Sequence, residues 1–458
     1  MVAIAPFHGY IYNKEEILNY GTYLTAPPYD VLTPSEREVY YQSHPHNILH
    51  VDLGRVLPED PDPMTWHGRS ASLLNEWLAQ KVLTRREKPT FFLLETEFSH
   101  PLTGKRLIRN GFVALLRLEE PLREARVRLH EQTFSFHKLE RLDLMRKTRA
   151  QLSPLFGFFP DPESKILNNL SMLRARGENM QIRDTSAQVH RVTFLEDGEL
   201  LAQLTQALAD KTVYIADGHH RYMTALNYQK EITANLKSQG LTPPAQSALN
   251  YVMIYLCPMG DPGLVVLPTH RILKRLDRTN EEILHSLAPY AEIRVFSYSE
   301  GGKQCASDAL MEKLQEDKKK GLTVFGLFLN GSDFCAFIKI KEKIKEALAD
   351  EAPEKAKLSL LDVSILTNVV LIKALGLTEE LMDEPDRISY ISQVDQAFNL
   401  VNAGSRAAFI LNPTSLQEIL TVTESGFVMP RKATYFYPKV SNGLVINLLD
   451  PFEVVGKA

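Results

Sequence analysis

The sequence predicts a mixed α/β fold, and three observations support this prediction. β-rich segments alternate with helix-like segments through the middle of the chain, which is typical of layered α/β cores. Hydrophobic residues make up 44% of the chain and charged residues 24%, as in ordinary soluble globular proteins. The length of 458 residues is enough for two or three lobes.

The first third of the chain is expected to contain a helix, a β-hairpin and a second helix. Thr33 is a suitable N-cap and Pro34 fits a first helical turn, so a helix should begin there. Two β-rich segments over 90–100 and 107–120 are separated by the turn-like sequence PLTGKR, which indicates a hairpin. A helix is expected within 137–152, before a proline that ends it.

The rest of the chain continues the alternation. Strands are expected over 190–197, 212–216, 248–257, 263–271 and 406–412, and helices over 198–210, 219–240, 358–375 and 393–404. A charged helix over 341–358 should lie at the surface near a lobe junction. We therefore expect an N-terminal α/β lobe over 1–190, a second α/β lobe over 191–345, and a helical region with closing strands over 346–458, which can all pack as one unit.

Charge, cysteine content and hydropathy argue against several classes of protein. The net charge of −4 gives no global attraction to nucleic acid or anionic membranes. The three cysteines form no CxxC pair, which argues against a disulfide framework or a thiolate zinc site. Neither a run of about 18 apolar residues nor a signal-peptide pattern occurs, so we expect a cytoplasmic protein without a membrane partner. The sequence does not indicate an oligomeric state.

The segment YIADGHHR carries the main candidate site. A strand that ends in Asp217 and Gly218 and leads into a helix directs backbone N–H groups and the positive end of the helix dipole at one position, where phosphate can bind. His219, His220 and Arg221 fall in the first helical turn and would add side-chain donors. Three potential cations at a helix start are unfavourable unless an anion compensates them. Alternatively, Asp217 caps the helix and the histidines are only hydrogen-bonded.

A second cationic segment lies in the helix expected within 137–152. Lys138 and Arg141 share one helical face with Leu142 and Met145, a mixture that suits the wall of an anion pocket. The alternative is a surface helix with snorkelling basic side chains.

Two carboxylates are candidates for a catalytic base. Glu131 can accept a proton or hold a metal, and Asp30 follows two prolines that stiffen the chain in APPYD. Asp30 is also a possible magnesium ligand, or it forms only a turn. The nearby HPHN, residues 44–47, can be a metal-binding pair, but two histidines beside a proline are more often ordinary loop residues.

Two later motifs bring polar side chains to strand ends. Thr269, His270 and Arg271 close the strand expected over 263–271, and ligands of α/β proteins bind at strand ends. Lys432 lies near the aromatic residues of MPRKATYFYPK, which can contact nucleic acid or form a terminal strand with alternating faces.

Together these motifs are similar to those of one large prokaryotic family. The segments APPYDVLTPSER, HEQT, SPLFGFFPD, YIADGHHRYMTAL, GLVVLPTHR and MPRKATYFYPK, in this order, resemble the family named domain of unknown function 1015 (DUF1015). Ala433 stands where serine is expected in the closing motif. The DGHHR turn is similar to the phosphate-binding turn of the ParB/sulfiredoxin-like superfamily, which includes partition proteins that hydrolyse CTP, sulfiredoxin and free-serine kinases. The resemblance implies a ParB/sulfiredoxin-like core with a mixed sheet and an additional helical C-terminal region.

The residues and the resemblance favour a kinase. It would transfer a phosphoryl group from ATP, ADP or pyrophosphate, with Mg²⁺, to a small hydroxylated metabolite, with free L-serine as the best candidate. The catalytic residues would be His219, Asp217, which would also bind the magnesium ion, and Glu131 or Asp30. The residues that contact phosphate would be Gly218, His220, Arg221, Lys138, Arg141 and Arg271. The residues that contact the substrate would be Thr269, His270 and Lys432. The alternatives are a ParB-like module that binds or hydrolyses nucleotide or binds nucleic acid, and a metal-dependent hydrolase.

Overall fold

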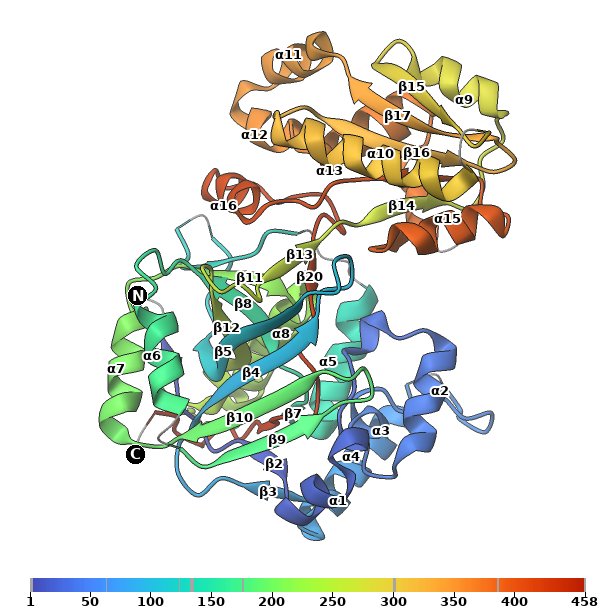
Figure 1. The fold of residues 1–458 in the computed structure, drawn as a ribbon. Helices are drawn as coiled ribbons and strands as arrows, with labels where there is room; N and C mark the ends of the chain where they lie inside the picture. Colours follow the sequence, from blue (N-terminus) through green and yellow to red (C-terminus); the bar gives the residue numbers. More distant parts are fainter. Residues whose placement is uncertain are drawn as a thin grey trace. The chain divides into compact units, whose positions relative to one another are not determined.

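Two units, each with its own β-sheet, make up the computed structural model of the chain (Figure 1). Unit 1 consists of Met1–Leu129, Thr133–Val265 and Pro438–Ala458, and unit 2 consists of His130–Gln132 and Val266–Tyr437. The structure describes residues 3–62, 64–122, 124–131, 136–174, 177–299, 302–384 and 387–456.

A nine-stranded mixed sheet forms the centre of unit 1, with strand order β6-β11-β8-β12-β5-β4-β10-β9 and β1 paired to β5. Its strands are β1 (Ile4–Ala5), β4 (Phe91–Ser99), β5 (Arg106–Arg117), β6 (Val127–Arg128), β8 (Leu155–Phe159), β9 (Asn179–Arg183), β10 (Val189–Leu195), β11 (Val213–Asp217) and β12 (Tyr251–Pro258). β11 runs parallel to β6, and β12 runs parallel to β8, while the other pairs are antiparallel. The antiparallel β4–β5 pair confirms the predicted hairpin.

Helices and two small sheets complete unit 1. The helices are α1 (Lys14–Leu24), α2 (Pro34–Ser43), α3 (Leu49–Asp52), α4 (Trp66–Ala79), α5 (Phe136–Thr148), α6 (Lys165–Leu173), α7 (Gly198–Leu208) and α8 (His219–Ser238), with 3₁₀ turns η1 (Tyr29–Val31) and η3 (Ala248–Asn250). The small sheets pair β2 (Tyr10–Tyr12) with β3 (Leu83–Arg85), and β7 (Ala150–Gln151) with β21 (Asn447–Leu448). The helices expected after Thr33, within 137–152, over 198–210 and over 219–240 are therefore confirmed.

Unit 2 contains an antiparallel six-stranded sheet with strand order β15-β17-β16-β19-β14-β18. Its strands are β14 (His270–Leu273), β15 (Ala291–Ser297), β16 (Val324–Leu329), β17 (Phe334–Ile340), β18 (Ile388–Ile391) and β19 (Ala407–Ile410); β13 (Val265–Leu267) pairs separately with β20 (Tyr435–Tyr437). The helices are α9 (Asn280–Leu287), α10 (Gly302–Lys319), α11 (Glu342–Glu351), η4 (Pro353–Lys355), α12 (Ala356–Ser359), α13 (Asp362–Ile365), the π-helix η5 (Leu366–Ala374), α14 (Glu379–Asp383), α15 (Val394–Asn402) and α16 (Leu416–Glu424).

Two details of the predicted elements need correction. The single strand expected over 263–271 is two strands, β13 and β14, because Pro268 and Thr269 interrupt it. Proline has no N–H for a sheet ladder, which accounts for the break. The charged segment 341–358 lies inside unit 2 and not at a lobe junction. The three-part division of the chain also differs from the two units, since β18 and β19, both beyond residue 345, pair with β14 in the unit 2 sheet.

Side-chain caps fix several helix starts. Thr33 and Glu36 form a full capping box at α2, as the sequence predicts for Thr33. Thr279 at α9 and Ser415 at α16 form the same motif with the glutamates three residues on. Each cap satisfies backbone N–H groups that the helix itself cannot pair, and so determines where the helix begins.

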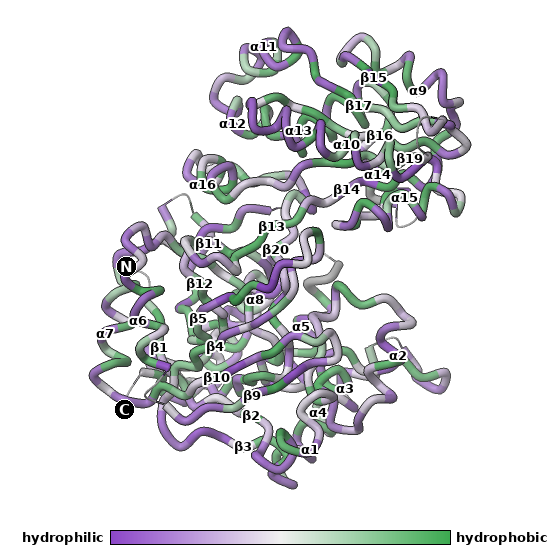
Figure 2. The backbone as a smooth tube through the Cα atoms, in the orientation of Figure 1, coloured by the Kyte–Doolittle hydropathy of each residue, from purple (hydrophilic) through white to green (hydrophobic). Residues whose placement is uncertain are grey.

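Apolar burial holds each unit together. In unit 1, one cluster joins the large sheet to α6, α7 and α8, and a second gathers around Trp66 and Trp77 in α4. In unit 2, Leu310 and Leu314 of α10 pack against the sheet with Val401 of α15. Each fully buried large apolar side chain contributes about 1.5–3 kcal/mol. Figure 2 shows hydrophobic residues along the strands of both sheets, while α11 is largely hydrophilic. None of the described helices is both long and apolar enough to cross a membrane.

The sheet of unit 1 leaves no room for a side chain at Gly111. A Cβ there would lie 2.6 Å from Cζ of Tyr255 and would also overlap the backbone oxygen of Leu256. We expect Gly111→Ala to destabilise the protein by about 1–3 kcal/mol or more, because overpacking forces backbone shifts. The unfolding midpoint in urea measures this change.

Gly68 in α4 provides the matched control. A Cβ at this helical position meets no atom within 4 Å. Gly68→Ala should therefore stabilise the protein by about 0.5–1 kcal/mol, since alanine loses less backbone entropy in a helix. Equal stability of the two variants would contradict the packing described around Gly111.

Candidate functional site

The turn from β11 into α8 has the geometry that the sequence predicts for an anion site. Gly218 has a φ of +91°, a left-handed conformation that favours glycine, and α8 begins at the next residue. A Cβ at Gly218 would lie 2.7 Å from Cδ2 of Leu155, so the turn also excludes a side chain for steric reasons. Because a helix cannot pair its own first N–H groups, its start attracts anions.

The N-cap of α8 is Gly218 and not Asp217. Among the described residues, no side chain accepts a capping hydrogen bond at this helix start. Of the two interpretations of the turn, capping by Asp217 is therefore wrong. The carboxylate of Asp217 has a different role, because it is the anion of a local ion cluster.

Asp217 lies between two cations. Arg221 Nη2 donates to Asp217 Oδ2 at 2.6 Å, and Lys439 Nζ donates to Asp217 Oδ1. Burial alone would raise the pKa of Asp217, but attraction to Lys439 and Arg221 outweighs burial and holds this pKa well below its usual value. Arg221 is also fixed by Nη1, which donates to Ser153 Oγ at 3.1 Å and to Pro154 O at 2.8 Å.

This arrangement does not fit the predicted magnesium ligand. Both carboxylate oxygens of Asp217 already accept hydrogen bonds from cationic groups. A Mg²⁺ ion requires close oxygen ligands at about 2.0–2.1 Å and would lie beside two positive side chains. Asp217 therefore positions Arg221 and Lys439, and the described residues around it do not form a protein cage for Mg²⁺.

A second arginine lies beside this cluster in unit 1. The guanidinium of Arg141, only 6% exposed, stacks on Tyr29 with Cζ 3.5 Å from the ring centroid. Arg141 Nη1 donates to the backbone oxygen and to Oδ1 of Asp52, at 2.7 and 3.0 Å. Within the described part of the chain, Nε and Nη2 of Arg141 have no hydrogen-bond partner. Buried donors without partners are costly, so an acceptor is expected there.

A cavity of about 40 Å³ lies between the two arginines. Its polar lining residues are Asp52, Arg141, Gln151, Ser153, Arg221 and Thr224, and apolar side chains make up most of the wall. The hydroxyl of Thr224 is buried and has no partner among the described residues. The cavity thus brings together cationic donors and hydroxyl groups, which is the chemistry that a phosphate or carboxylate group requires.

Asp30 belongs to the same region. It is exposed in η1, one residue after the tyrosine that stacks on Arg141. Burial lowers the pKa of Arg221, but Asp217 and then Asp30 raise it, and the net shift is upward. The structure therefore brings together APPYD, the helix α5 and the DGHHR turn, three motifs that are far apart in the sequence.

The histidines of the turn lie at the start of α8. His219 is buried and close enough to Asp217 to contribute to the lowered pKa of that carboxyl group. His220 is half-buried in the same turn. The side chain of Lys138, which was predicted to contact phosphate, lies outside the described residues, although its backbone is in α5.

The remaining predicted residues form a separate cluster in unit 2. Thr269 Oγ1 donates to the backbone oxygen of Lys432 at 2.6 Å and accepts from Arg271 Nη1 at 2.6 Å. Glu131 Oε1 accepts from the backbone N–H and the hydroxyl of Thr434, at 3.1 and 3.0 Å. The hydroxyl of Thr269 and the Nη1 group of Arg271 thus donate within this unit.

His270, the third predicted substrate contact, lies in the interior of unit 2. The ring is fully buried, and Nδ1 accepts the backbone N–H of Leu411 at 3.2 Å. Burial, followed by repulsion from Arg271, lowers the pKa of His270 to about 3. The ring is therefore uncharged and enclosed, with Nδ1 bound to the backbone and the buried Nε2 without a hydrogen-bond partner among the described residues.

Three residues of the site were not identified from the sequence. Lys439 was noted only as part of an aromatic and basic motif, and the partners Tyr29 and Asp52 had no assigned role. Lys439 and Asp217 are 222 residues apart. A local sequence pattern gives no signal for such a contact, so only the folded chain reveals it.

Solved structures give a distant comparison. A free serine kinase in complex with AMP is 13% identical, with a TM-score of 0.31, over 71% of this chain and 85% of that chain. A conserved hypothetical protein from Pyrococcus furiosus is 15% identical, with a TM-score of 0.32, over 71% and 94%. SbnI with a C-terminal truncation from Staphylococcus aureus is 9% identical, with a TM-score of 0.30, over 72% and 85%. Scores this low carry no argument about activity.

Comparison of the sequence with family models identifies the family of the chain, which the solved structures do not. No curated protein matches the chain significantly. The model of the family described as "Protein of unknown function (DUF1015)" matches residues 4–364, well over half of the chain. The resemblance noted from the motifs is thereby confirmed, and the chain belongs to the DUF1015 family.

Proposed function

We propose that this protein is a kinase that transfers a phosphoryl group to the hydroxyl of a small metabolite. Free L-serine is the best candidate for the acceptor, and ATP, ADP or pyrophosphate for the donor. The observation that carries the proposal is the cavity between Arg141 and Arg221 beside the start of α8. Phosphoryl transfer depends mainly on positioning and on charge neutralisation, and such a site supplies both.

The charge pattern of the site suits an anionic ligand. Lys439 and Arg221 share Asp217, and Arg141 lies 3.0 Å from Asp52 Oδ1 and 3.9 Å from Glu140 Oε1, so the cationic groups of the site are held among carboxylates. The dipole of α8 adds positive potential at Gly218. A phosphate group would accept hydrogen bonds from Arg141 Nε and Nη2, which have no hydrogen-bond partner among the described residues.

The transfer step needs a base, and Asp30 is the better candidate. Asp30 lies in unit 1 with the arginines, whereas one oxygen of Glu131 accepts two hydrogen bonds from Thr434 in unit 2. In the step, the acceptor oxygen forms a bond to phosphorus, and the bond between phosphorus and the leaving oxygen breaks. The hydroxyl proton passes to Asp30, and ADP, AMP or phosphate leaves.

The histidines would assist in different ways. His219, next to Asp217, lies where the transferred group would pass the start of α8, and His220 would contact the donor's phosphates. Positioned donors that strengthen their contacts as charge develops lower the barrier of the reaction.

Phosphorus NMR tests the activity directly. The protein is mixed with magnesium, each of the three donors and a panel of hydroxy amino acids and sugars. A new phosphomonoester resonance should appear with one acceptor, while one equivalent of donor is consumed. Donor hydrolysis at the same rate with every acceptor and with none would contradict the proposal and would favour a nucleotide-hydrolysing module.

The His219→Ala/His220→Ala double variant tests the turn. We expect at least a 100-fold loss of transfer, because removing one oxyanion-type donor alone typically costs about 10²–10³ in rate. Circular dichroism should show an unchanged fold. His285→Ala, at an exposed position of α9, is the control and should retain full activity. Normal turnover by the double variant would refute the assignment.

Asp217→Asn tests the ion cluster by stability. At pH 7 the variant should lose about 3 kcal/mol, because two largely buried cations lose their partner. The folded pKa of Asp217 is depressed, so its contribution is present above the unfolded pKa of about 3.9 and is lost as pH falls through the folded value. The stability gap between wild type and variant should therefore narrow below about pH 4.

Urea midpoints at pH 7, 5 and 3 measure this gap. Asp350→Asn, an exposed position in α11, is the matched control and should change stability by less than about 0.5 kcal/mol at each pH. A gap for Asp217→Asn that stays constant down to pH 3 would contradict the ion cluster.

A further inference from the structure

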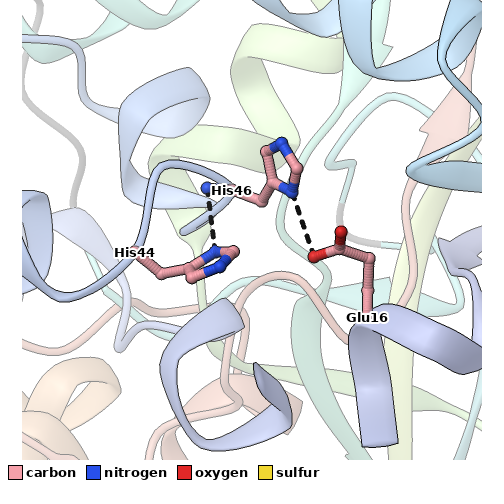
Figure 3. A group of neighbouring side chains, drawn as sticks. All are labelled: Glu16, His44 and His46. Carbon is pink, nitrogen blue, oxygen red and sulfur yellow. Dashed lines mark hydrogen bonds and ion pairs between the residues drawn. The ribbon is translucent and has the colours of Figure 1, made fainter. Parts of the chain in front are cut away.

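We propose that Glu16, His44 and His46 form a binding site for one divalent transition-metal ion, with Zn²⁺ as the preferred ion (Figure 3). The proposal is independent of the proposed kinase activity, which uses none of these residues. Two imidazoles and one carboxylate form the ligand set of many zinc sites, and imidazole ligands disfavour Mg²⁺ and Ca²⁺.

The three side chains already face one another. One ligand atom from each lies within 4.8 Å of the other two, and all three residues are half-buried. His46 Nδ1 and Glu16 Oε2 are 3.0 Å apart. Ligands around a tetrahedral zinc ion are about 3.3 Å apart when each bond is near 2.0 Å. Only a modest approach of His44 is therefore required to close the site.

Hydrogen bonds hold the loop that carries both histidines. The hydroxyl of Tyr12 donates to the backbone oxygen of His46 at 2.6 Å. The backbone N–H of Asn47 donates to the backbone oxygen of His44 at 3.0 Å, and its side-chain amide donates to Tyr23 O and Thr25 O. The HPHN segment is therefore a fixed loop, and fixed ligands lose little entropy when a metal binds.

Aromatic side chains orient the two rings. His44 stacks on Tyr20 with the ring centroids 4.4 Å apart, and His46 meets Trp77 edge to face at 5.6 Å. On the other side, Glu16 is placed by the start of α1, where Asn13 accepts its backbone N–H at 2.8 Å. Each ligand thus has a support from outside the ligand set.

The protons of the site are compatible with a metal. His44 Nδ1 accepts the backbone N–H of His46 at 3.1 Å, so a neutral ring carries its proton on Nε2. A metal at Nδ1 would replace this N–H, and a metal at Nε2 would require the opposite tautomer, so the hydrogen bond is lost in both cases. A metal bound by His46 Nδ1 and Glu16 Oε2 would also replace the hydrogen bond between these two atoms.

Calorimetric titration of the full-length, metal-stripped protein with Zn²⁺ tests the site. We expect one equivalent to bind, and His44→Ala and His46→Ala should each weaken binding by more than about 100-fold, since even outer-shell changes cost about 10–100-fold. Mg²⁺ should not bind at these residues. With Co²⁺, visible absorption bands of a four-coordinate ion should appear in the wild type and be absent from both variants.

Glu16→Gln and His285→Ala complete the design. Glu16→Gln keeps the size of the side chain but removes its charge, so it should weaken Zn²⁺ binding while the metal-free melting temperature stays close to that of the wild type. His285→Ala, far from the loop in sequence and exposed, should bind like the wild type. Zinc should raise the melting temperature of the wild type and of His285→Ala only. Equal zinc affinity in the wild type and the His44→Ala/His46→Ala double variant would overturn the proposal.

Discussion

The carboxylate of Asp217, held between Arg221 and Lys439, is the interaction on which the candidate site depends. It joins the end of β11, the first turn of α8 and the C-terminal segment of unit 1. Because all three groups are largely buried, removal of any one would leave an uncompensated charge in a poorly solvated place. The ion pair between Asp217 and Arg221 also holds the guanidinium of Arg221 against Ser153, and so determines one wall of the cavity.

The C-terminal segment organises the other wall. The chain leaves unit 1 at Val265 and returns at Pro438. Within unit 1, the backbone N–H groups of Tyr10 and Ile446 each donate to the backbone oxygen of the other residue. Asn442 of the C-terminal segment donates to Asp52 Oδ2 at 2.7 Å, while Oδ1 of the same carboxylate accepts from Arg141. These bonds connect Asn442, Asp52 and Arg141 in one buried polar network, in which Asn442 Oδ1 and two nitrogens of Arg141 have no partner among the described residues. Lys439 and Asn442 of this segment therefore contact the two carboxylates, Asp217 and Asp52, that bind the arginines of the site.

Local signals in the sequence were sufficient for many of the elements and for the break between strand and helix at Gly218. Thr33 caps its helix, the hairpin over 90–117 pairs as expected, and Gly218 separates strand from helix, because caps, alternation and turns act over a few residues. Long-range contacts gave no such signal. The partner of Asp217 lies 222 residues away, and Glu16 lies 30 residues before His46, in a different element. The division into units was equally hidden, because it depends on which strands pair.

The hydrogen bonds and ring contacts of three buried arginines indicate which of them could bind a ligand. Arg109 has two nitrogens without an acceptor in the described structure, but its guanidinium lies over the rings of Phe156 and Tyr255 at 4.6 and 5.2 Å, which provide cation–π contacts instead. Arg271 directs Nη1 at Thr269 and lies over Tyr390. Arg141 also has a cation–π contact, with Tyr29, but it differs from both in that its two nitrogens without a hydrogen-bond partner belong to a residue that lines a cavity, whose wall is largely apolar and includes a few polar groups. A buried donor beside a cavity of this kind is stable only when water or a ligand fills it, so Arg141 is the arginine at which an anion would gain most.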